Sequence, residues 1–161
     1  MTRSTFVIFI ACLSLAGSGC KDSGADASTS YSITEDHSNI VDPEARWHAY
    51  RLSDYVLEQQ RSCFCVPDGL CDIYVKNNVV VDVIRKQDGR SIMPDAAARY
   101  KTVEDLFALT RTFNPDSVAS MTIEFDRRFG YPKLIAVDIS AQMTDEEFAY
   151  QTSSVRRLTS K

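Results

Sequence analysis

Residues 71–84 read CDIYVKNNVVVDVI, and this segment predicts a β-hairpin. Ile73 and Val75 alternate with polar residues, which is the two-residue period of a strand with one buried face. The Asn77-Asn78 pair suits a tight turn, because asparagine tolerates a positive φ better than most residues. The β-branched run over residues 79–84 then predicts a second strand that is buried on at least one side.

The residues before this hairpin predict a third strand. Residues 55–65 show no helical stripe, and their Ser62-Cys63-Phe64-Cys65 segment favours an extended backbone. Pro67-Asp68-Gly69 is a turn signal that would return the chain to the hairpin. We therefore expect the first half of the folded chain to form a three-stranded antiparallel meander.

Two helices are predicted from their first residues and their apolar spacing. Asp42-Pro43-Glu44 supplies an N-cap acid, a proline at the first helical position and an acid in the first turn, which predicts a short helix over residues 43–51. Thr102 would cap a second helix, and the apolar stripe of that helix comprises Val103, Leu106, Phe107, Thr110 and Phe113. We expect Trp47 and Phe107 to lie in the core.

The second half of the chain predicts three more strands. Residues 121–125 and 135–139 alternate apolar with polar side chains, and Gly130-Tyr131-Pro132 turns the chain between them. We expect Asp126 to accept backbone N–H groups of that turn. Phe148, Tyr150 and Thr152 suggest a last strand at the sheet edge. The order of helix, three strands, helix, three strands predicts an α+β fold with an antiparallel sheet.

The first twenty residues have the layout of a bacterial lipoprotein signal. Arg3 precedes an apolar run over residues 6–15, and small residues lead to Cys20. The run is too short to span a bilayer. We expect residues 1–19 to be a signal peptide, residues 20–40 a lipid anchor at Cys20 with a flexible tether, and residues 41–161 a single domain. The alternative is an ordinary cleaved signal peptide, since Gly17 stands where lipoproteins usually carry an aliphatic residue.

This layout predicts a protein of the bacterial cell envelope that faces the periplasm or the exterior. It would contact the membrane through the lipid on Cys20. Without residues 1–19 the chain has 17 basic and 22 acidic residues, a net charge of −5. That balance argues against a nucleic-acid partner, because phosphate binding needs clustered positive charge.

The chain also resembles a known family through several motifs. These are W-x(7)-Y, C-F-C, TVEDLF, EFDRRFGYPKLIAVD and DEEFAY, and together they resemble DUF6174, a domain-of-unknown-function family of bacterial envelope lipoproteins, over residues 47–157. Asn77-Asn78 and Cys71 depart from its usual pattern. The resemblance implies an envelope location and leaves the activity open. Its landmarks here are Trp47, Tyr55, Cys63, Cys65, Phe107, Asp126, Gly130, Tyr131, Pro132, Asp138, Asp145 and Glu147.

Three cysteines remain in the exported domain, and an oxidising envelope favours a disulfide between two of them. An extended strand would hold Cys63 and Cys65 about 6.5–7 Å apart, which strains a bridge between them. We therefore expect a disulfide across the hairpin that joins Cys71 to Cys65 or Cys63. The alternatives are a redox pair or a soft metal site formed by the three cysteines. His37 and His48 lie outside any ligand spacing with these cysteines, so we predict no metal.

No catalytic motif is evident in the sequence, and we predict no cofactor and no enzyme activity. An acidic set could perform acid–base work, but we expect turns and a solvated connection: Asp126, Asp138, Asp145, Glu146 and Glu147. Some residues could serve either structure or an aromatic interaction groove: Trp47, Asp126, Gly130, Tyr131 and Pro132. We expect a non-enzymatic interaction or structural module with an unknown envelope protein partner. The alternative is a thiol-dependent redox enzyme or sensor that uses Cys63, Cys65 and Cys71.

Overall fold

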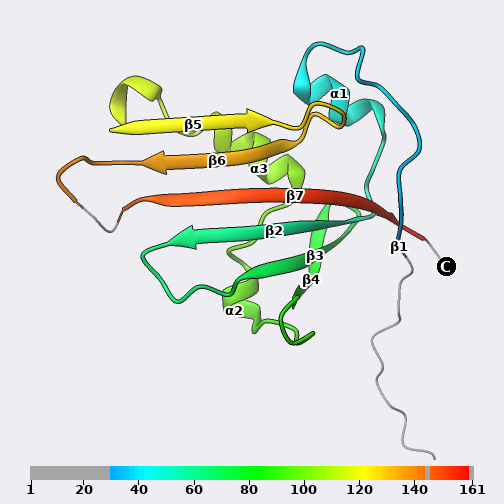
Figure 1. The fold of residues 1–161 in the computed structure, drawn as a ribbon, viewed down its shortest axis with the longest axis horizontal. Helices are drawn as coiled ribbons and strands as arrows, with labels where there is room; N and C mark the ends of the chain where they lie inside the picture. The colour runs from blue at the N-terminus through cyan, green and yellow to red at the C-terminus, as the bar shows by residue number, and fades with distance from the viewer. Residues whose placement is uncertain (1–29, 144–145, 160–161) are drawn as a thin grey trace, which may run out of the picture.

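The computed structural model describes residues 30–143 and 146–159, which form one antiparallel sheet with short helices (Figure 1). Six strands follow the order β4-β3-β2-β7-β6-β5, and the short β1 pairs with β7. The fold is therefore α+β, as predicted. The strands are β1 (Ser30–Tyr31), β2 (Tyr55–Cys63), β3 (Leu70–Lys76), β4 (Val79–Arg85), β5 (Ser120–Phe125), β6 (Pro132–Asp138) and β7 (Phe148–Leu158). The helices are α1 (Pro43–Ala49), α2 (Pro94–Ala97), α3 (Val103–Thr110) and a 3-10 turn at Pro115–Ser117.

The predicted meander is present as β2, β3 and β4. Asn77 and Asn78 both have positive φ, at 50° and 60°, as the tight turn between β3 and β4 requires. Ile73 and Val75 are fully buried on the face that the helices cover. Figure 1 shows α2 and α3 behind the sheet, so the face toward the viewer is the one without helices.

Both helices begin at their predicted caps. The Asp42 side chain accepts from the N–H of Ala45, and Thr102 forms a capping box with Asp105. The helices end earlier than their patterns indicate, at Ala49 and Thr110. Trp47 and Phe107 are 1% and 2% exposed, which confirms that both belong to the core.

The predicted tether is too long. Residues 1–29, including the signal peptide, Cys20 and the first part of the tether, lie outside the described residues. Residues 30–40, however, pack on the domain: β1 pairs with the end of β7, and Ile33 is only 4% exposed. Ile33 is a single apolar residue in a polar stretch, so the sequence pattern gave no sign that it is buried. The predicted element order accordingly lacks β1, and it also lacks α2.

The last strand is central, not at the edge as predicted. β7 pairs with β2 on one side and β6 on the other. Its sequence, FAYQTSSVRRL, looked like an edge strand because its polar side chains face the uncovered side of the sheet. On the covered side, Tyr150, Thr152 and Val155 are buried. Alternation of apolar and polar side chains indicates that one face of a strand is exposed to solvent. It does not indicate whether the strand lies at the edge or in the centre of the sheet.

The turn between β5 and β6 docks on α1. Asp126 accepts from the N–H groups of Arg128 and Phe129 at 2.9 and 2.7 Å, as predicted. Gly130 has φ +87°, and a Cβ there would lie 2.1 Å from the carbonyl oxygen of Pro43. Arg46 of α1 donates to the carbonyl of Arg127 at 2.6 Å. Gly130 is therefore needed both for its backbone conformation and for the close approach of the helix.

Gly130→Ala should destabilise the domain by about 3 kcal/mol or more, because the new methyl adds a clash to an unfavourable φ. Gly89→Ala is the matched control, since Gly89 also has positive φ (+68°) but open space around it. That control should lose only about 1–2 kcal/mol. Urea unfolding of both variants beside the parent measures the difference. Equal losses in the free energy of unfolding for the two variants would show that the close approach of Pro43 does not restrict the residue at position 130.

Candidate functional site

Most residues that the sequence singled out for interaction lie inside the domain. Trp47 and Tyr131 are at most 2% exposed. Gly130 and Pro132 are also buried, and the Asp126 carboxylate accepts hydrogen bonds from the backbone of the turn that follows it. The structure places no aromatic groove at these residues. Two other parts of the described structure expose apolar side chains beside a cavity: the loop after β2 and the outer edge of β4.

The disulfide joins Cys63 to Cys65, and not to Cys71 as we predicted. The prediction assumed an extended backbone through residue 65. Instead β2 ends at Cys63 and the chain turns at Phe64, with the Cys65 N–H donating to the Cys63 carbonyl at 2.7 Å. The turn brings the two Cα atoms to 5.2 Å, within the usual range for a bridge.

Cys71 is a free thiol in the core. It lies on β3 opposite Gln59 of β2, four residues before Cys63, and it is fully buried. Its sulfur is 3.2 Å from the Tyr100 hydroxyl. Burial raises the pKa of the Cys71 thiol, which disfavours the reactive thiolate. Cys71 is therefore not placed to act with the other two cysteines, and no cluster of three metal-ligating side chains occurs in the described ranges.

Of Cys63, Cys65 and Cys71, only Cys71 should react with iodoacetamide in unreduced protein purified from the envelope, and only after unfolding. In the native state the burial of its sulfur should slow alkylation by at least tenfold relative to the unfolded chain. Mass spectrometry of the digested protein locates the label. Modification at Cys63 or Cys65 without a reductant would contradict the observed pairing.

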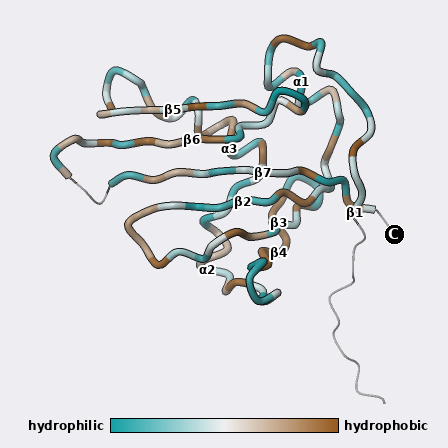
Figure 2. Tube along the Cα trace, in the orientation of Figure 1, coloured by the Kyte–Doolittle hydropathy of each residue, from teal (hydrophilic) through white to brown (hydrophobic). Residues whose placement is uncertain are grey.

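The Cys63–Cys65 bridge contributes little to global stability. It closes a loop of three residues, for which the chain-entropy relation gives about 1.6 kcal/mol, less than most disulfides provide. What it shapes is the loop that follows β2. Phe64 and Val66 in this loop are 79% and 86% exposed, and Figure 2 shows hydrophobic residues at this point of the trace.

Arg61 faces the two sulfur atoms. Its guanidinium Nη1 lies 2.7 Å from the Cys63 Sγ and 3.4 Å from the Cys65 Sγ. None of the described carboxylates forms an ion pair with Arg61. We did not predict this contact, although the i, i+2 spacing of Arg61 and Cys63 was a signal for it, because alternate residues share one side of a strand.

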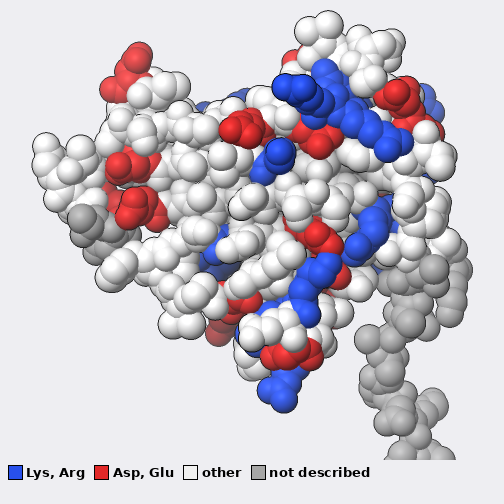
Figure 3. All heavy atoms as spheres, viewed as in Figure 1, with Lys and Arg blue, Asp and Glu red and all other residues white. Residues whose placement is uncertain are grey.

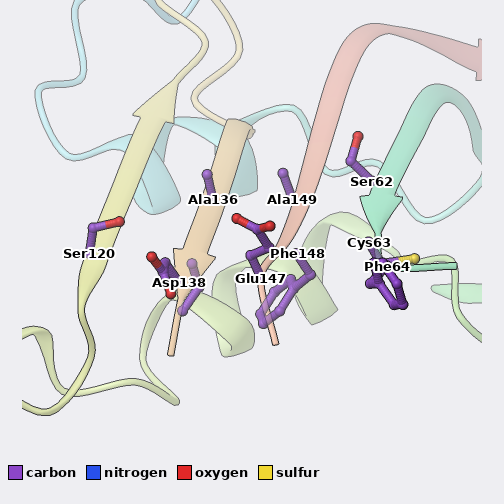
Figure 4. Close-up of a pocket in the computed structure, with 10 residues that line it drawn as sticks. Ser62, Cys63, Phe64, Ser120, Ala136, Asp138, Glu147, Phe148 and Ala149 are labelled. Atoms are coloured by element: carbon purple, nitrogen blue, oxygen red, sulfur yellow. The ribbon is translucent and has the colours of Figure 1, made fainter. Parts of the chain in front are cut away.

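A hollow of about 430 Å³ lies beside the disulfide (Figure 4). Its floor is the uncovered face of the sheet, where Ser62, Ala149 and Ala136 pair in one row across β2, β7 and β6. Asp138 and Glu147 also line it. Figure 3 shows acidic atoms at this end of the face.

The predicted acidic set is divided by the sheet. Asp126 follows β5, and Asp138 ends β6, which runs antiparallel to β5, so these two carboxyl groups lie at opposite ends of the pair. Asp145 lies outside the described residues. The only members of the set that share a cavity among those described are Asp138 and Glu147.

A second and larger cavity, of about 870 Å³, borders the outer edge of β4. One wall is the strand itself over residues 79–83. The opposite wall comes from α2 and the first turn of α3, including Ala97 and Thr102. Val79, Val81 and Met93 at this cavity are 61%, 53% and 75% exposed. The sequence predicted a strand over residues 79–84 that is buried on at least one side. Val83 is fully buried, as that prediction requires, whereas Val79 and Val81 are exposed.

The edge of β4 is only partly covered. Its second half pairs with the chain that returns after it: Ile92 donates to the Val83 carbonyl at 2.8 Å, and Arg85 donates to the Arg90 carbonyl at 2.9 Å. Over residues 79–82, no strand pairs with the outer side of β4 in the part of the chain that the structure describes. Apolar side chains and an unpaired strand edge therefore coincide at this cavity.

A family model described as a family of unknown function, DUF6174, matches residues 39–157. No curated protein and no solved structure matches the chain. Among the described helices, none is both long and apolar enough to cross a membrane.

Proposed function

Since the chain belongs to the DUF6174 family, whose function is unknown, we propose a function from its own geometry. The protein is a lipid-anchored, non-enzymatic binding module of the bacterial envelope. It holds an extended, apolar segment of a partner protein against the outer edge of β4. The coincidence of an unpaired strand edge with an apolar cavity is the observation that carries this proposal.

An extended segment satisfies both features of this cavity. An edge strand presents unpaired N–H and C=O groups, which a segment in strand conformation pairs with directly. Alternate side chains of such a segment would point into the space between β4 and α2. The exposed Val79, Val81 and Met93 surround that space, so they favour apolar side chains in the partner.

The proposed anchor would confine this binding to the membrane surface. Between Cys20 and the first described residue, Ser30, ten peptide steps span at most about 35 Å when fully extended. A domain held this close to a membrane meets other envelope proteins at high effective concentration. A weak contact at β4 would then be sufficient for function.

Replacement of the proposed lipidated cysteine, Cys20→Ala, should release the protein from the membrane fraction. The acyl chains would be its main membrane contact, because one or two buried chains set the strength of such anchoring. Fractionation of cells that produce the variant, with intact-mass measurement of the parent, tests this expectation. The parent should carry acyl mass on Cys20, and a variant that stays in the membrane to the same extent would refute the anchor.

A photo-crosslinking residue at Met93 should form an adduct with a discrete partner in intact cells. The same residue at Val41, which is 89% exposed and precedes α1, is the positional control and should not form it. Val81→Lys should reduce the Met93 adduct at least fivefold, because a charge on the edge opposes strand addition. Thr122→Lys, on the other edge strand β5, should leave the adduct unchanged.

Thermal melting of both lysine variants is needed beside the crosslinking. Val81 and Thr122 are exposed, so both proteins should melt within a few degrees of the parent. An adduct that survives Val81→Lys, or that forms equally from Val41, would refute binding at β4.

A further inference from the structure

We propose that Cys63–Cys65 is a redox-active disulfide that exchanges with dithiols, and that Arg61 stabilises the Cys63 thiolate formed when the bond opens. This activity goes beyond the binding function at β4 and does not depend on it. Its basis is the contact between a guanidinium and both sulfur atoms at an exposed loop.

Arg61 is placed where it would stabilise a negative charge on the Cys63 sulfur. The intact disulfide is neutral, so it gains little from a guanidinium beside it. A thiolate at Cys63 would instead gain a charge-assisted hydrogen bond from the guanidinium that already contacts this sulfur. Arg61 makes no ion pair with a described carboxylate, so its charge is not engaged elsewhere in the part of the chain that the structure shows.

The exposure of the two cysteines sets the direction of attack. Cys65 is exposed, whereas Cys63 is half-buried at the end of β2. An incoming thiolate therefore reaches the Cys65 sulfur, and Cys63 becomes the leaving group. Arg61 lies nearer to the Cys63 Sγ than to the Cys65 Sγ, so it stabilises the sulfur that departs. A more stable leaving thiolate departs faster.

The exchange is balanced with a dithiol as the electron donor. One donor thiolate attacks the Cys65 sulfur, the bond to Cys63 breaks, and its electron pair goes to the Cys63 sulfur. The second donor thiol loses its proton and attacks the donor sulfur of the mixed disulfide, which releases Cys65. The donor loses two electrons and two protons and becomes a disulfide, while Cys63 and Cys65 end as thiols.

Opening this bond would be a local event. The last residue pair of β2 with β7 is Cys63 with Phe148, so the bridge lies beyond the sheet and crosses no strand pair. Cys71, the other thiol of the folded domain, is buried on β3 and takes no part. The hollow beside Ser62 and Cys63 is also lined by Phe64, the residue between the two cysteines.

The test equilibrates the full-length protein, in detergent, with dithiothreitol and glutathione buffers of graded composition at pH 5, 7 and 9. Acid quenching, alkylation and mass spectrometry give the reduced fraction of Cys63 and Cys65 separately from Cys71. We expect the pair to reach equilibrium with these thiols while the fold remains intact. The parent and the Arg61→Met variant are compared at each pH.

The effect of Arg61 should depend on pH. At pH 5 both thiols of the reduced pair are protonated, so the parent and Arg61→Met should have equal equilibrium constants for reduction. As the pH passes the range near 8.5 where ordinary cysteines ionise, the parent gains from its stabilised thiolate. By pH 9 its reduction should be favoured about tenfold over Arg61→Met, which corresponds to about 30 mV.

Two further variants separate charge from structure. Arg61→Lys keeps the positive charge and should retain part of the pH-dependent difference. Arg111→Met removes an exposed arginine that pairs with Glu44, far from the sulfurs in the fold, and should match the parent at every pH. Thermal melting verifies that each variant is folded.

A disulfide that resists both buffers until the protein unfolds would overturn the proposal. So would an Arg61→Met protein that differs from the parent equally at all three pH values, since that result indicates a structural role for Arg61. Neither outcome bears on the binding proposed at β4, which crosslinking from Met93 tests separately.

Discussion

The carboxylate of Glu104 joins three elements of this fold, and the cavity at β4 depends on the resulting frame. It accepts from the Trp47 indole of α1 at 3.0 Å and from the Tyr55 hydroxyl of β2 at 2.9 Å. The same hydroxyl accepts from the N–H of Val103 at the start of α3. Burial and the neighbouring carboxylate raise the pKa of Tyr55, so its hydroxyl stays a donor. Because unpaired polar groups in a core are costly, this set holds α1 and α3 at fixed positions on the sheet.

The fixed position of α3 also defines the cavity at β4. Lys101, directly before α3, exchanges two hydrogen bonds between its backbone and the side chain of the buried Gln59 on β2. That contact and the Glu104 set anchor the start of the helix, whose first turn forms one wall of the cavity. An extended segment would thus enter a preformed space, and binding would not require the helix to move. Preformed sites lose less affinity to ordering of the protein.

Local signals in the sequence predicted most of the elements, and topology explains what they missed. Helix caps and tight turns depend only on residues that are close in the sequence, so the local sequence is sufficient to predict them. Asp42, Thr102 and the Asn77-Asn78 turn are examples. The central place of β7 and the exposed edge of β4 depend on which strands pair, and neither alternation nor β-branching encodes that choice. The prediction of the disulfide pairing was wrong for a different reason. It depended on the end of β2 falling at Cys63, two residues before the point that we assumed.

The sheet also separates the disulfide loop from the proposed point of attachment. β1 enters beside the end of β7, and β2 runs away from that end toward the disulfide (Figure 1). If Cys20 is anchored, the Cys63–Cys65 loop is presented at the opposite end of the sheet, where proteins in the surrounding compartment can reach it. Strand β3 and the buried Cys71 lie between that loop and β4. Neither Cys63 nor Cys65 lines the cavity at β4, so a redox change at the loop removes no group from that cavity.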